Sequence, residues 1–458
     1  MMTLAEAALA TKGLVVGANV AFNAVTTDSR KAAPGDLFVA LQGEHFDGHD
    51  YVAQCFEQGA VAAMIGERSA VSGQLAAKPM LVVADTRLGL GDLAAHWRGK
   101  FALPLAAVTG SNGKTTVKEM LAAIVRVAAG NDAVLATEGN LNNDIGLPLT
   151  LFKLASRHRY AVIEMGMNHP GEIAYLTRIA KPTVALINNA QPAHLEGLGS
   201  MDAVARAKGE IFEGLAANGT AAINADDAFA SLWKQLAAPH SIMTFGLEQA
   251  ADVSADYRLS TDGSDLTLKT PQGPIRLHLA VPGLHNVRNA LAAATAALAM
   301  GVALADIAAG LAGFGGVKGR LQRKAGCRGV SVIDDTYNAN PASMRAAIQV
   351  LAQAAGKKLF VMGDMGELGA EAPKLHAEIG AAAKAAGIDR LYALGDLSRE
   401  SVKAFGAGAR HFEAVEFLWS GLQGELASGV TVLVKGSRFM RMERVVDLLA
   451  QQENASCC

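Results

Sequence analysis

In the middle of the chain, short apolar runs alternate with segments whose apolar residues recur at helical spacing. Strand-like runs lie at 105–109, 160–164, 183–188 and 220–224, and each precedes or follows a helical pattern. Such alternation is typical of a parallel sheet with crossover helices. Apolar and polar residues then alternate around Gly263 and Gly273, which predicts hairpins appended to this parallel domain.

The last third of the chain repeats the strand–helix alternation. Strands are expected at 330–334, 358–362, 390–394 and 431–434, which predicts a smaller doubly wound domain. It is preceded by an alanine-rich stretch at 291–305, expected to form one buried or half-buried helix. A glycine cluster at 313–319 resembles a hinge.

The first 83 residues differ from the rest, because short β-rich runs such as 36–41 and 80–83 are separated by Gly, Asp and His clusters. A chain of 458 residues also exceeds one ordinary hydrophobic core. We therefore expect an α/β protein with three domains, at residues 1–83, 84–313 and 314–458. The middle one would carry a parallel sheet of the P-loop type, and the last one would be Rossmann-like.

Composition and charge limit the possible binding partners and the cellular compartment of the protein. The net charge is −2 and no basic face stands out, so a nucleic-acid partner is not indicated. The apolar stretch at 291–305 is shorter than the ~20 residues that span a bilayer. The four cysteines form no CxxC pair, two of them are Cys457 and Cys458, and the N-terminus lacks a basic region. We expect a cytoplasmic protein without membrane insertion.

The strongest chemical motif is the run Thr-Gly-Ser-Asn-Gly-Lys-Thr-Thr at 109–116, between an expected strand and a helix at 116–127. Glycines let backbone N–H groups converge on phosphate oxygens, and the helix N-terminus adds partial positive charge. Lys114 would reach the β- and γ-phosphates, and the Thr115 hydroxyl would ligate Mg²⁺. The predicted ATP-binding residues of this loop are Gly110, Ser111, Asn112, Gly113, Lys114, Thr115 and Thr116.

The glycine spacing departs from the common P-loop, which would need glycine at the position of Val108. Here the first glycine is Gly110, with only two residues before the Gly-Lys pair. A glycine-rich turn with an incidental lysine is the alternative. The strand–loop–helix context favours a variant nucleotide loop.

Two polar residues follow consecutive strands of the same expected sheet. Glu164 closes the strand at 160–164, and His194 follows the strand at 183–188, so both lie at the edge where ligands bind in such sheets. Each alone could be an ordinary polar residue at a strand end. Lys208, at an expected helix start, has the pattern of a solvated surface lysine.

The loop at 109–116 resembles the phosphate loop of the Mur ligase family, the amide-forming enzymes of peptidoglycan precursor synthesis. Further motifs agree in order across nearly the whole chain. The resemblance implies that Glu164, His194 and Lys208 form a magnesium site beside the catalytic Lys114. It also implies that Lys208 is carboxylated, its amine having added carbon dioxide.

The resemblance extends to the nucleotide contacts. The stretch 285–289 is similar to the family's adenine-contacting sequence, which implies roles for Asn286 and Asn289, one helical turn apart. Capping of the alanine-rich helix is the competing explanation for these asparagines. Arg320 resembles the family's phosphate-contacting arginine, and Asp335 its ribose-contacting aspartate.

Three stretches, 335–341, 362–369 followed by His376, and 434–438, resemble the branch that adds D-alanyl-D-alanine to UDP-N-acetylmuramoyl-tripeptide. The resemblance implies a ligase that uses ATP and Mg²⁺, forms an acyl phosphate and has these two substrates as partners. We expect a monomer, although the sequence itself leaves the oligomeric state open. An N-terminal domain would bind the uridine diphosphate. The implied substrate-binding residues are Ser29, Arg30, Gly43, Asp47, Gly48, His49, Asn140, Asn142, Asn143, Tyr337, Asn338, Asn340, Asp364, Glu367, Lys435 and Arg438.

Three alternatives remain at this point. A sister ligase would add a single amino acid to a muramoyl-peptide or glutamate to folate. A P-loop phosphotransferase would leave phosphate on its substrate, and a nucleotide-binding regulator would have no need of Glu164, His194 and Lys208 together. The third residue of the acceptor peptide, diaminopimelate or lysine, stays open.

Overall fold

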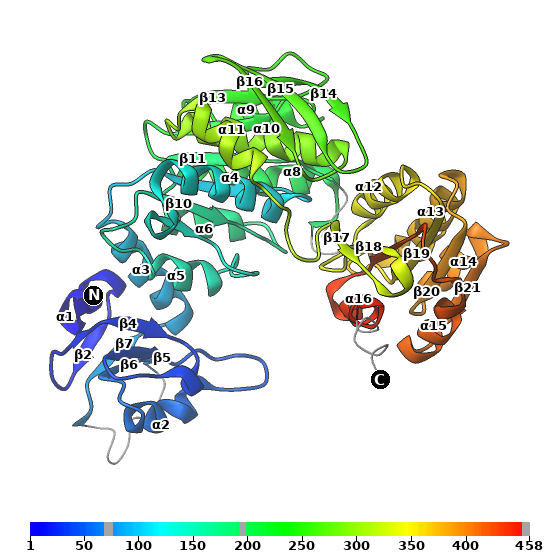
Figure 1. The fold of residues 1–458 in the computed structure, drawn as a ribbon. Helices are drawn as coiled ribbons and strands as arrows, with labels where there is room; N and C mark the ends of the chain where they lie inside the picture. The colour runs from blue at the N-terminus through cyan, green and yellow to red at the C-terminus, as the bar shows by residue number, and fades with distance from the viewer. Residues whose placement is uncertain (68–76, 192–197, 451–458) are drawn as a thin grey trace, which may run out of the picture.

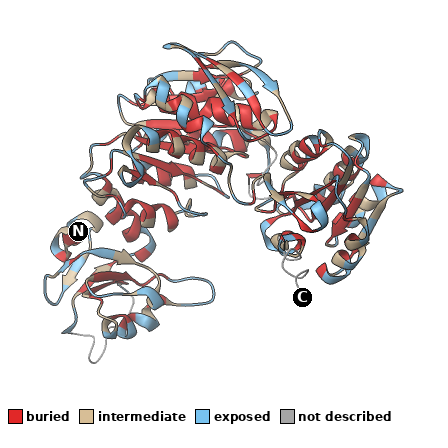
Figure 2. Ribbon diagram, viewed as in Figure 1, coloured by how far each residue is buried: buried red, intermediate tan, exposed pale blue. Residues whose placement is uncertain are grey.

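The computed structural model describes residues 1–67, 77–191 and 198–450. These residues form three α/β domains arranged as an open arc, blue, cyan to green, and yellow to red along the chain (Figure 1). In the central and C-terminal domains the inner strands of the large sheets are buried between more exposed helices (Figure 2). The expected α/β fold with three domains is confirmed.

The N-terminal domain is built on a five-stranded sheet. Among the described strands of this sheet, the pair β2–β7 is antiparallel and the other pairs are parallel. All four residues of β5 are buried because both faces of the sheet are covered, which explains its continuous apolar run. The sheet order is β2 (Leu14–Val16), β7 (Met80–Val83), β6 (Ala62–Gly66), β5 (Asp36–Val39) and β4 (Ala24–Thr26), with helices α1 (Leu4–Thr11) and α2 (Val52–Glu57) and a small pair β1 (Met2–Thr3) and β3 (Ala21–Phe22).

The central domain holds an all-parallel six-stranded sheet. Three of the expected strands have the expected bounds, and the one at 183–188 is shorter by a residue at each end. The sheet order is β13 (Ser241–Phe245), β12 (Thr220–Asn224), β11 (Val184–Ile187), β8 (Leu105–Thr109), β10 (Tyr160–Glu164) and β9 (Val134–Ala136). The helices are α3 (Thr86–Arg98), α4 (Lys114–Ala129), α5 (Gly146–Leu151), α6 (Glu172–Ala180), α8 (Met201–Gly209), α9 (Ala230–Leu236), α10 (Leu284–Ala299) and α11 (Leu304–Ala312).

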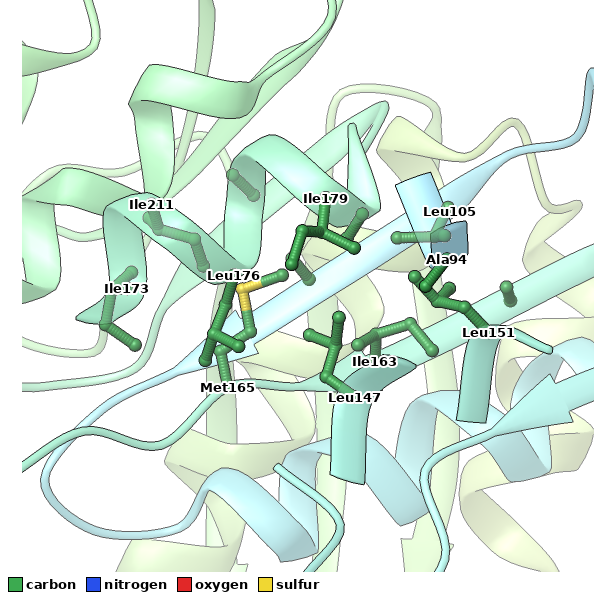
Figure 3. Close-up of a cluster of buried hydrophobic side chains, with 14 of the residues drawn as sticks. Ala94, Leu105, Leu147, Leu151, Ile163, Met165, Ile173, Leu176, Ile179 and Ile211 are labelled. Atoms are coloured by element: carbon green, nitrogen blue, oxygen red, sulfur yellow. The ribbon is translucent and has the colours of Figure 1, made fainter. Parts of the chain in front are cut away.

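Side chains alternate between the two faces of β8, so one strand serves two cores. Leu105 and Ala107 face a core shared with α3, α5 and α6, which Figure 3 shows around Leu176 and Ile179. Ala106 and Val108 face α4 and the alanine-rich α10. The phosphate loop is thus anchored by a strand buried on both sides.

The expected hairpins form a three-stranded antiparallel sheet that packs on α10 and α11. Its strands are β14 (Ser254–Leu259), β15 (Ser264–Thr270) and β16 (Gly273–Leu279). The single helix expected at 291–305 is wrong. Helix α10 ends at Ala299, and α11 starts at Leu304, because the chain turns at Gly301, whose φ of +78° suits glycine.

The C-terminal domain has a second six-stranded sheet, parallel except for the pair β17–β18. All four expected strands are present, displaced by at most one residue at either end. The sheet order is β17 (Gln322–Ala325), β18 (Ser331–Asp335), β22 (Val430–Lys435), β19 (Lys357–Gly363), β20 (Arg390–Leu394) and β21 (Ala409–Phe412). Its helices are α12 (Pro341–Ala352), α13 (Ala372–Ala385), α14 (Ser398–Phe405), α15 (Val415–Leu422) and α16 (Glu443–Ala450). No helix in the described ranges is long and apolar enough to cross a membrane.

Candidate active site

A cavity of about 1630 Å³ lies between the central and C-terminal domains, with the phosphate loop in its wall. It opens at the carboxyl ends of β8 and β10, the edge where parallel sheets bind ligands. The cavity is larger than the ~300–1,000 Å³ of a typical small-molecule site. Its lining includes Gly110, Ser111, Asn112, Gly113, Lys114, Thr115, Asn140, Asn142, Asn143, Glu164, Lys208, Arg320, Tyr337, Asn338, Asn340, Glu367 and Arg438.

The phosphate loop depends on glycine at position 113. Gly113 has a φ of +79°, and a Cβ there would lie 2.4 Å from Asn289 Oδ1. Lys114 begins α4 and donates from Nζ to the Gly110 carbonyl at 2.7 Å, so its side chain curls over the loop. Burial lowers the pKa of Lys114, and the nearby Glu164 carboxylate opposes that shift. The loop therefore presents one lysine and a set of backbone groups toward the cavity.

Glu164 ends β10 with only 3% of its surface exposed. Its Oε1 accepts a hydrogen bond from Asn142 Nδ2 at 2.9 Å, whereas its Oε2 is buried with no partner among the described residues. A buried carboxylate oxygen without a partner is costly unless a cation occupies the space beside it. Together with the Thr115 hydroxyl in the same cavity wall, it supplies the hard oxygen donors that Mg²⁺ prefers.

His194 lies outside the described residues. Within the described residues, no group of three or more His, Cys, Asp and Glu side chains could hold a metal ion. Thr116, the last residue of the loop motif, is half-buried on the first turn of α4 and does not line the cavity.

Lys208 is buried, with 1% of its surface exposed, and it lines the cavity. The expectations of a helix start and of a solvated lysine are both wrong, because Lys208 lies near the end of α8, in the protein interior. Burial lowers the pKa of Lys208 well below its usual range; Lys114 adds to the shift and Asp227 opposes it. A buried amine in its neutral form is nucleophilic, so it can add carbon dioxide.

Asn286 and Asn289 lie on the first turns of α10 and are both buried. Asn286 Nδ2 donates to the Pro282 carbonyl at 2.8 Å, and Asn289 Oδ1 accepts from Asn188 Nδ2 at 3.1 Å. Gly283 occupies the N-cap, and no side chain caps the N–H groups there. Capping of α10 therefore does not explain the two asparagines. Asn289 instead connects the helix to Asn188 after β11, and Asn286 bonds the segment that precedes the helix.

The C-terminal domain reaches the phosphate loop through Arg320. Its guanidinium stacks 4.0 Å from the centre of the Tyr337 ring, and its Nη2 donates to Thr115 Oγ1 at 3.3 Å. Arg320 Nε is buried without a partner among the described residues. A stacked guanidinium at the loop can contact phosphate oxygens, since its fork matches their geometry.

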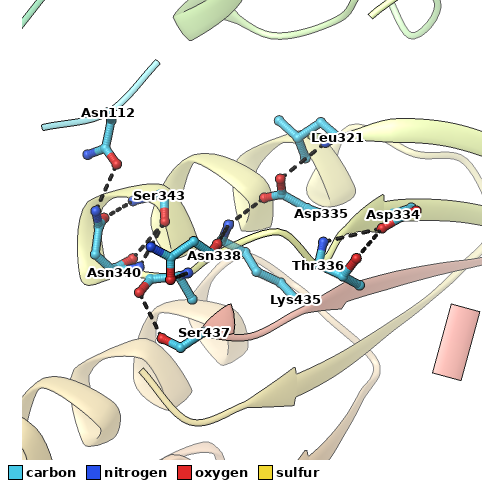
Figure 4. A network of polar contacts seen from close by, with 11 residues as sticks. Asn112, Leu321, Asp334, Asp335, Thr336, Asn338, Asn340, Ser343, Lys435 and Ser437 are labelled. Atoms are coloured by element: carbon cyan, nitrogen blue, oxygen red, sulfur yellow. Dashed lines mark hydrogen bonds and ion pairs between the residues drawn. The ribbon is translucent and has the colours of Figure 1, made fainter. Parts of the chain in front are cut away.

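Asn340 forms a second bridge between these domains. Its Nδ2 donates to Asn112 Oδ1 at 2.8 Å, and its Oδ1 caps α12 by accepting from the Ser343 amide at 2.9 Å (Figure 4). The two roles use opposite ends of one side-chain amide. Asn340 therefore fixes the start of α12 against the phosphate loop.

Asp335 and Lys435 form an ion pair of 2.6 Å, and both are buried (Figure 4). Asp335 also accepts from the Leu321 amide at 3.1 Å, and Lys435 donates to the Asn338 carbonyl at 2.8 Å. The structure thus gives Lys435 a carboxylate partner within the domain. Asp335 is the last residue of β18, and Asn338 lies in the connection from β18 to α12.

Asp364 follows β19, and its carboxylate accepts hydrogen bonds from the Ser398 amide at 2.7 Å and the Leu397 amide at 3.2 Å. These amides belong to the start of α14, so Asp364 acts as a remote cap of that helix. Glu367, with a φ of +62°, and Arg438 both line the cavity. Arg438 is 66% exposed and pairs with Glu443 at 3.1 Å.

The six residues expected to bind uridine diphosphate lie in the N-terminal domain. His49 Nδ1 lies 2.5 Å from Asp47, and its Nε2 accepts from the Gly66 amide at 3.0 Å, so the pair supports the fold. Arg30 is 84% exposed and pairs with Asp28. Within the described chain, none of the six lines the cavity beside the phosphate loop; they are Ser29, Arg30, Gly43, Asp47, Gly48 and His49.

Sequence reasoning missed several residues of the cavity wall. Arg87 and Asp144 form an ion pair there, with Nη2 3.0 Å from Oδ1, and Lys118 lies on α4 below the loop. The only sequence signal for Lys118 is its position one helical turn after Lys114. Nothing in the local pattern pairs Arg87 with Asp144, which lies 57 residues away.

Three family models match the chain, described as Mur ligase family, catalytic domain (residues 21–98), Mur ligase middle domain (108–297) and Mur ligase, glutamate ligase domain (319–438). The chain belongs to the Mur ligase family. The UDP-N-acetylmuramoyl-tripeptide--D-alanyl-D-alanine ligase of Escherichia coli K12 is 45% identical over 100% of this Mur ligase and 99% of that protein.

Solved structures of Mur ligases agree with the fold. A crystal structure of MurF from Acinetobacter baumannii is 40% identical with a TM-score of 0.90, covering 98% of each chain. The MurF ligase of Thermotoga maritima, solved in complex with ADP, is 28% identical with a TM-score of 0.81, covering 93% of this Mur ligase and 97% of that chain.

Proposed function

We propose that this Mur ligase joins D-alanyl-D-alanine to UDP-N-acetylmuramoyl-tripeptide, with hydrolysis of ATP to ADP and phosphate, in cytoplasmic peptidoglycan precursor synthesis. The observation that carries the proposal is 45% identity along the whole chain to an enzyme of that name. The cavity adds chemical support, because a phosphate loop, a buried carboxylate with one oxygen unpartnered and a buried lysine share its wall. We propose that it acts as a monomer.

A carboxylate is a poor acylating agent, so the reaction needs a leaving group. The terminal carboxylate of the tripeptide attacks the γ-phosphate of ATP, which gives an acyl phosphate and ADP. The free amine of D-alanyl-D-alanine then attacks the acyl carbon, and the tetrahedral intermediate expels phosphate as the amide forms. Lys114 and Arg320, which both contact the phosphate loop, would neutralise charge on the transferred phosphoryl group.

Thr115 and Glu164 would hold Mg²⁺, with His194 as a further ligand. When bound, the ion neutralises the crowded phosphate charge. Lys208 in its carbamate form would add an acidic group to the same site, since carbon dioxide converts its neutral amine into an anion. The unpartnered Oε2 of Glu164 and the suppressed charge of Lys208 support these assignments.

Each of the three domains would bind a different substrate. Residues 84–313 bind ATP, with Asn286 and Asn289 toward adenine, and 314–458 bind the incoming dipeptide, with Asp335 toward ribose. Residues 1–83 bind the uridine diphosphate. The C-terminal domain contributes Tyr337, Glu367 and the exposed cation Arg438 to the cavity for the dipeptide, and Asn140, Asn142 and Asn143 of the central domain, which line the same cavity, would contact the acceptor peptide.

The direct test mixes the purified protein with UDP-N-acetylmuramoyl-tripeptide, D-alanyl-D-alanine and Mg-ATP. We expect phosphate release that requires the dipeptide and a product of matching mass. Phosphate release independent of the dipeptide would overturn the ligase. Phosphate left on the substrate would indicate a phosphotransferase, absence of any turnover a regulator, and preference for a single amino acid a sister ligase.

The carbamate has its own test. Lys208→Ala should be nearly inactive and should recover with added short-chain carboxylate, which fills the space left by the carbamate. Normal turnover of Lys208→Ala would show that Lys208 has no role at the metal site. Lys403→Ala, an exposed lysine on α14, is the matched control and should keep wild-type turnover.

A further inference from the structure

Lys118 is a lysine that is fully buried in the central domain, one helical turn after Lys114 on α4. Its Nζ donates to the Thr137 carbonyl at 2.7 Å and pairs with Glu119. Burying a lysine costs free energy, and replacing buried ion pairs with apolar residues is often neutral or stabilising. Stability alone therefore does not account for a lysine here.

The Thr137 carbonyl is available because the sheet is irregular at this point. Strand β9 is the edge of the central sheet, and its register pairs Val162 of β10 with Ala136. The Thr137 amide continues this ladder by donating to the Val162 carbonyl at 3.0 Å. In a regular parallel ladder the Thr137 carbonyl would then accept from the amide of Glu164.

Instead, the Glu164 amide donates to the hydroxyl of Thr137, at 3.0 Å. The side chain of Thr137 thus replaces its own carbonyl as the partner of Glu164, and the carbonyl turns toward α4, where Lys118 supplies the donor. Because β9 is the edge strand of the sheet, no other strand in the described part of the chain supplies a donor from that side. Lys118 is therefore what satisfies the displaced carbonyl.

The segment after Thr137 surrounds the same glutamate. Asn142 Nδ2 donates to Glu164 Oε1 at 2.9 Å, and the Asn142 carbonyl accepts from the Gly166 amide at 2.8 Å. The backbone and the carboxylate of Glu164 are thus both fixed by residues 137–142. Lys118 anchors the first of these residues to the helix that carries Lys114 and Thr115.

We infer that Lys118 is a positioning residue for the metal site: through Thr137, it sets the place of the Glu164 carboxylate relative to the phosphate loop. The inference rests on the proposed role of Glu164 as a magnesium ligand. Lys118 and Glu164 line one cavity with Lys114, so displacement of the 137–142 segment would move Glu164 within that cavity. Residues that orient metal ligands typically change metal affinity or activity 10–100-fold when replaced.

The test measures how strongly Mg²⁺ supports ADP binding, by calorimetry with Mg²⁺ and with EDTA. Lys118→Met should reduce the Mg²⁺-dependent gain in ADP affinity about tenfold, with affinity in EDTA within about twofold of wild type. The Mg²⁺ concentration giving half-maximal ligation should rise by a similar factor. Lys118→Arg should recover part of the loss, since its guanidinium can donate to the Thr137 carbonyl.

Arg126→Met is the matched control, because Arg126 lies on the same helix and near the same Glu119, at 3.9 Å, without contacting Thr137. It should keep wild-type Mg²⁺ dependence. If Lys118→Met fails to fold, Thr137→Val tests the inference instead, since it removes only the hydroxyl that accepts from the Glu164 amide. Thr137→Ser keeps a hydroxyl and should restore wild-type Mg²⁺ dependence.

Wild-type Mg²⁺ dependence in Lys118→Met or in Thr137→Val overturns the inference. The binding measurement needs no acceptor substrate. A wild-type protein that binds Mg-ADP but forms no amide would therefore overturn the proposed function and leave the role of Lys118 to be decided by the variants.

Discussion

Asn340 of the C-terminal domain donates its side-chain amide to Asn112 of the phosphate loop at 2.8 Å, across 228 residues of sequence. The same side chain caps α12 with its oxygen. One residue therefore carries both a stabilising contact within its domain and a contact between domains, and the two can be separated by substitution.

Asn340→Asp should separate the contact with Asn112 from the capping of α12. Aspartate caps helices as well as asparagine does, so the thermal midpoint should stay near that of wild type. Its carboxylate cannot donate to Asn112 and adds negative charge beside the phosphate loop, so KM for ATP should rise about tenfold. Asn340→Ala loses both contacts and should also cost about 1 kcal/mol of stability. Steady-state kinetics and thermal unfolding of the two variants check this; an unchanged KM in Asn340→Asp would contradict it.

Tyr337 should act through its ring, which supports the Arg320 guanidinium at 4.0 Å. Tyr337→Phe keeps the aromatic face and should leave KM for ATP within about twofold. Tyr337→Leu removes the aromatic face, and since such stacking contributes about 0.5–2 kcal/mol, KM should rise roughly 2- to 30-fold. Equal losses in both variants would show that the hydroxyl, and not the ring, is what matters.

Lys208→Met should give a more stable but inactive protein. Burial lowers the folded-state pKa of Lys208 below its usual 10.5, so between these two pKa values the unfolded chain binds more protons than the folded one. Wild-type stability therefore falls as pH falls through that interval, by about 1.4 kcal/mol per pH unit. Methionine has no ionisable amine, so Lys208→Met removes this loss of stability.

The stability gain of Lys208→Met should be about 1–4 kcal/mol at pH 7, and it should shrink as pH rises toward 10.5. Urea unfolding from pH 7 to 9.5 in buffer free of carbon dioxide measures this gain, because a carbamate on the wild-type lysine would mask it. A gain that does not depend on pH would point to packing instead of charge.

Asp364 should affect stability more than dipeptide binding. Its carboxylate is engaged by the Ser398 and Leu397 amides, so Asp364→Ala should cost about 1–2 kcal/mol and leave KM for D-alanyl-D-alanine within about twofold. Glu367→Gln is the comparison, because Glu367 lines the cavity and its substitution should raise that KM. The reverse pattern would assign the incoming ammonium to Asp364.

The sheets were predictable because their strands are buried on both faces. Strands such as β8 and β10 are continuous apolar runs with sharp ends, and the expected bounds match. The end of α10 was missed because alanine-rich sequence continues across the turn at Gly301, and only the backbone angle of that glycine marks the break.

The site was less predictable, because burial and partners come from distant parts of the chain. Lys208 looks solvated in its own segment, and its burial comes from packing of the whole domain. The carboxylate of Asp364 is engaged by amides 33 or more residues away. The Lys118–Thr137 contact depends on an irregular backbone hydrogen bond at the edge of the sheet. The spacing of apolar residues in the sequence does not reveal such an irregularity.

The cavity between the domains also bears on antibacterial chemistry. A compact compound would leave much of its roughly 1630 Å³ filled with water and would compete with two charged substrates at once. The hydrogen-bonded contact between Asn112 and Asn340 is a smaller target for a compound. A rigid molecule wedged between these two amides would hold the C-terminal domain away from the phosphate loop, and so would act on the approach of the two domains as well as on nucleotide binding.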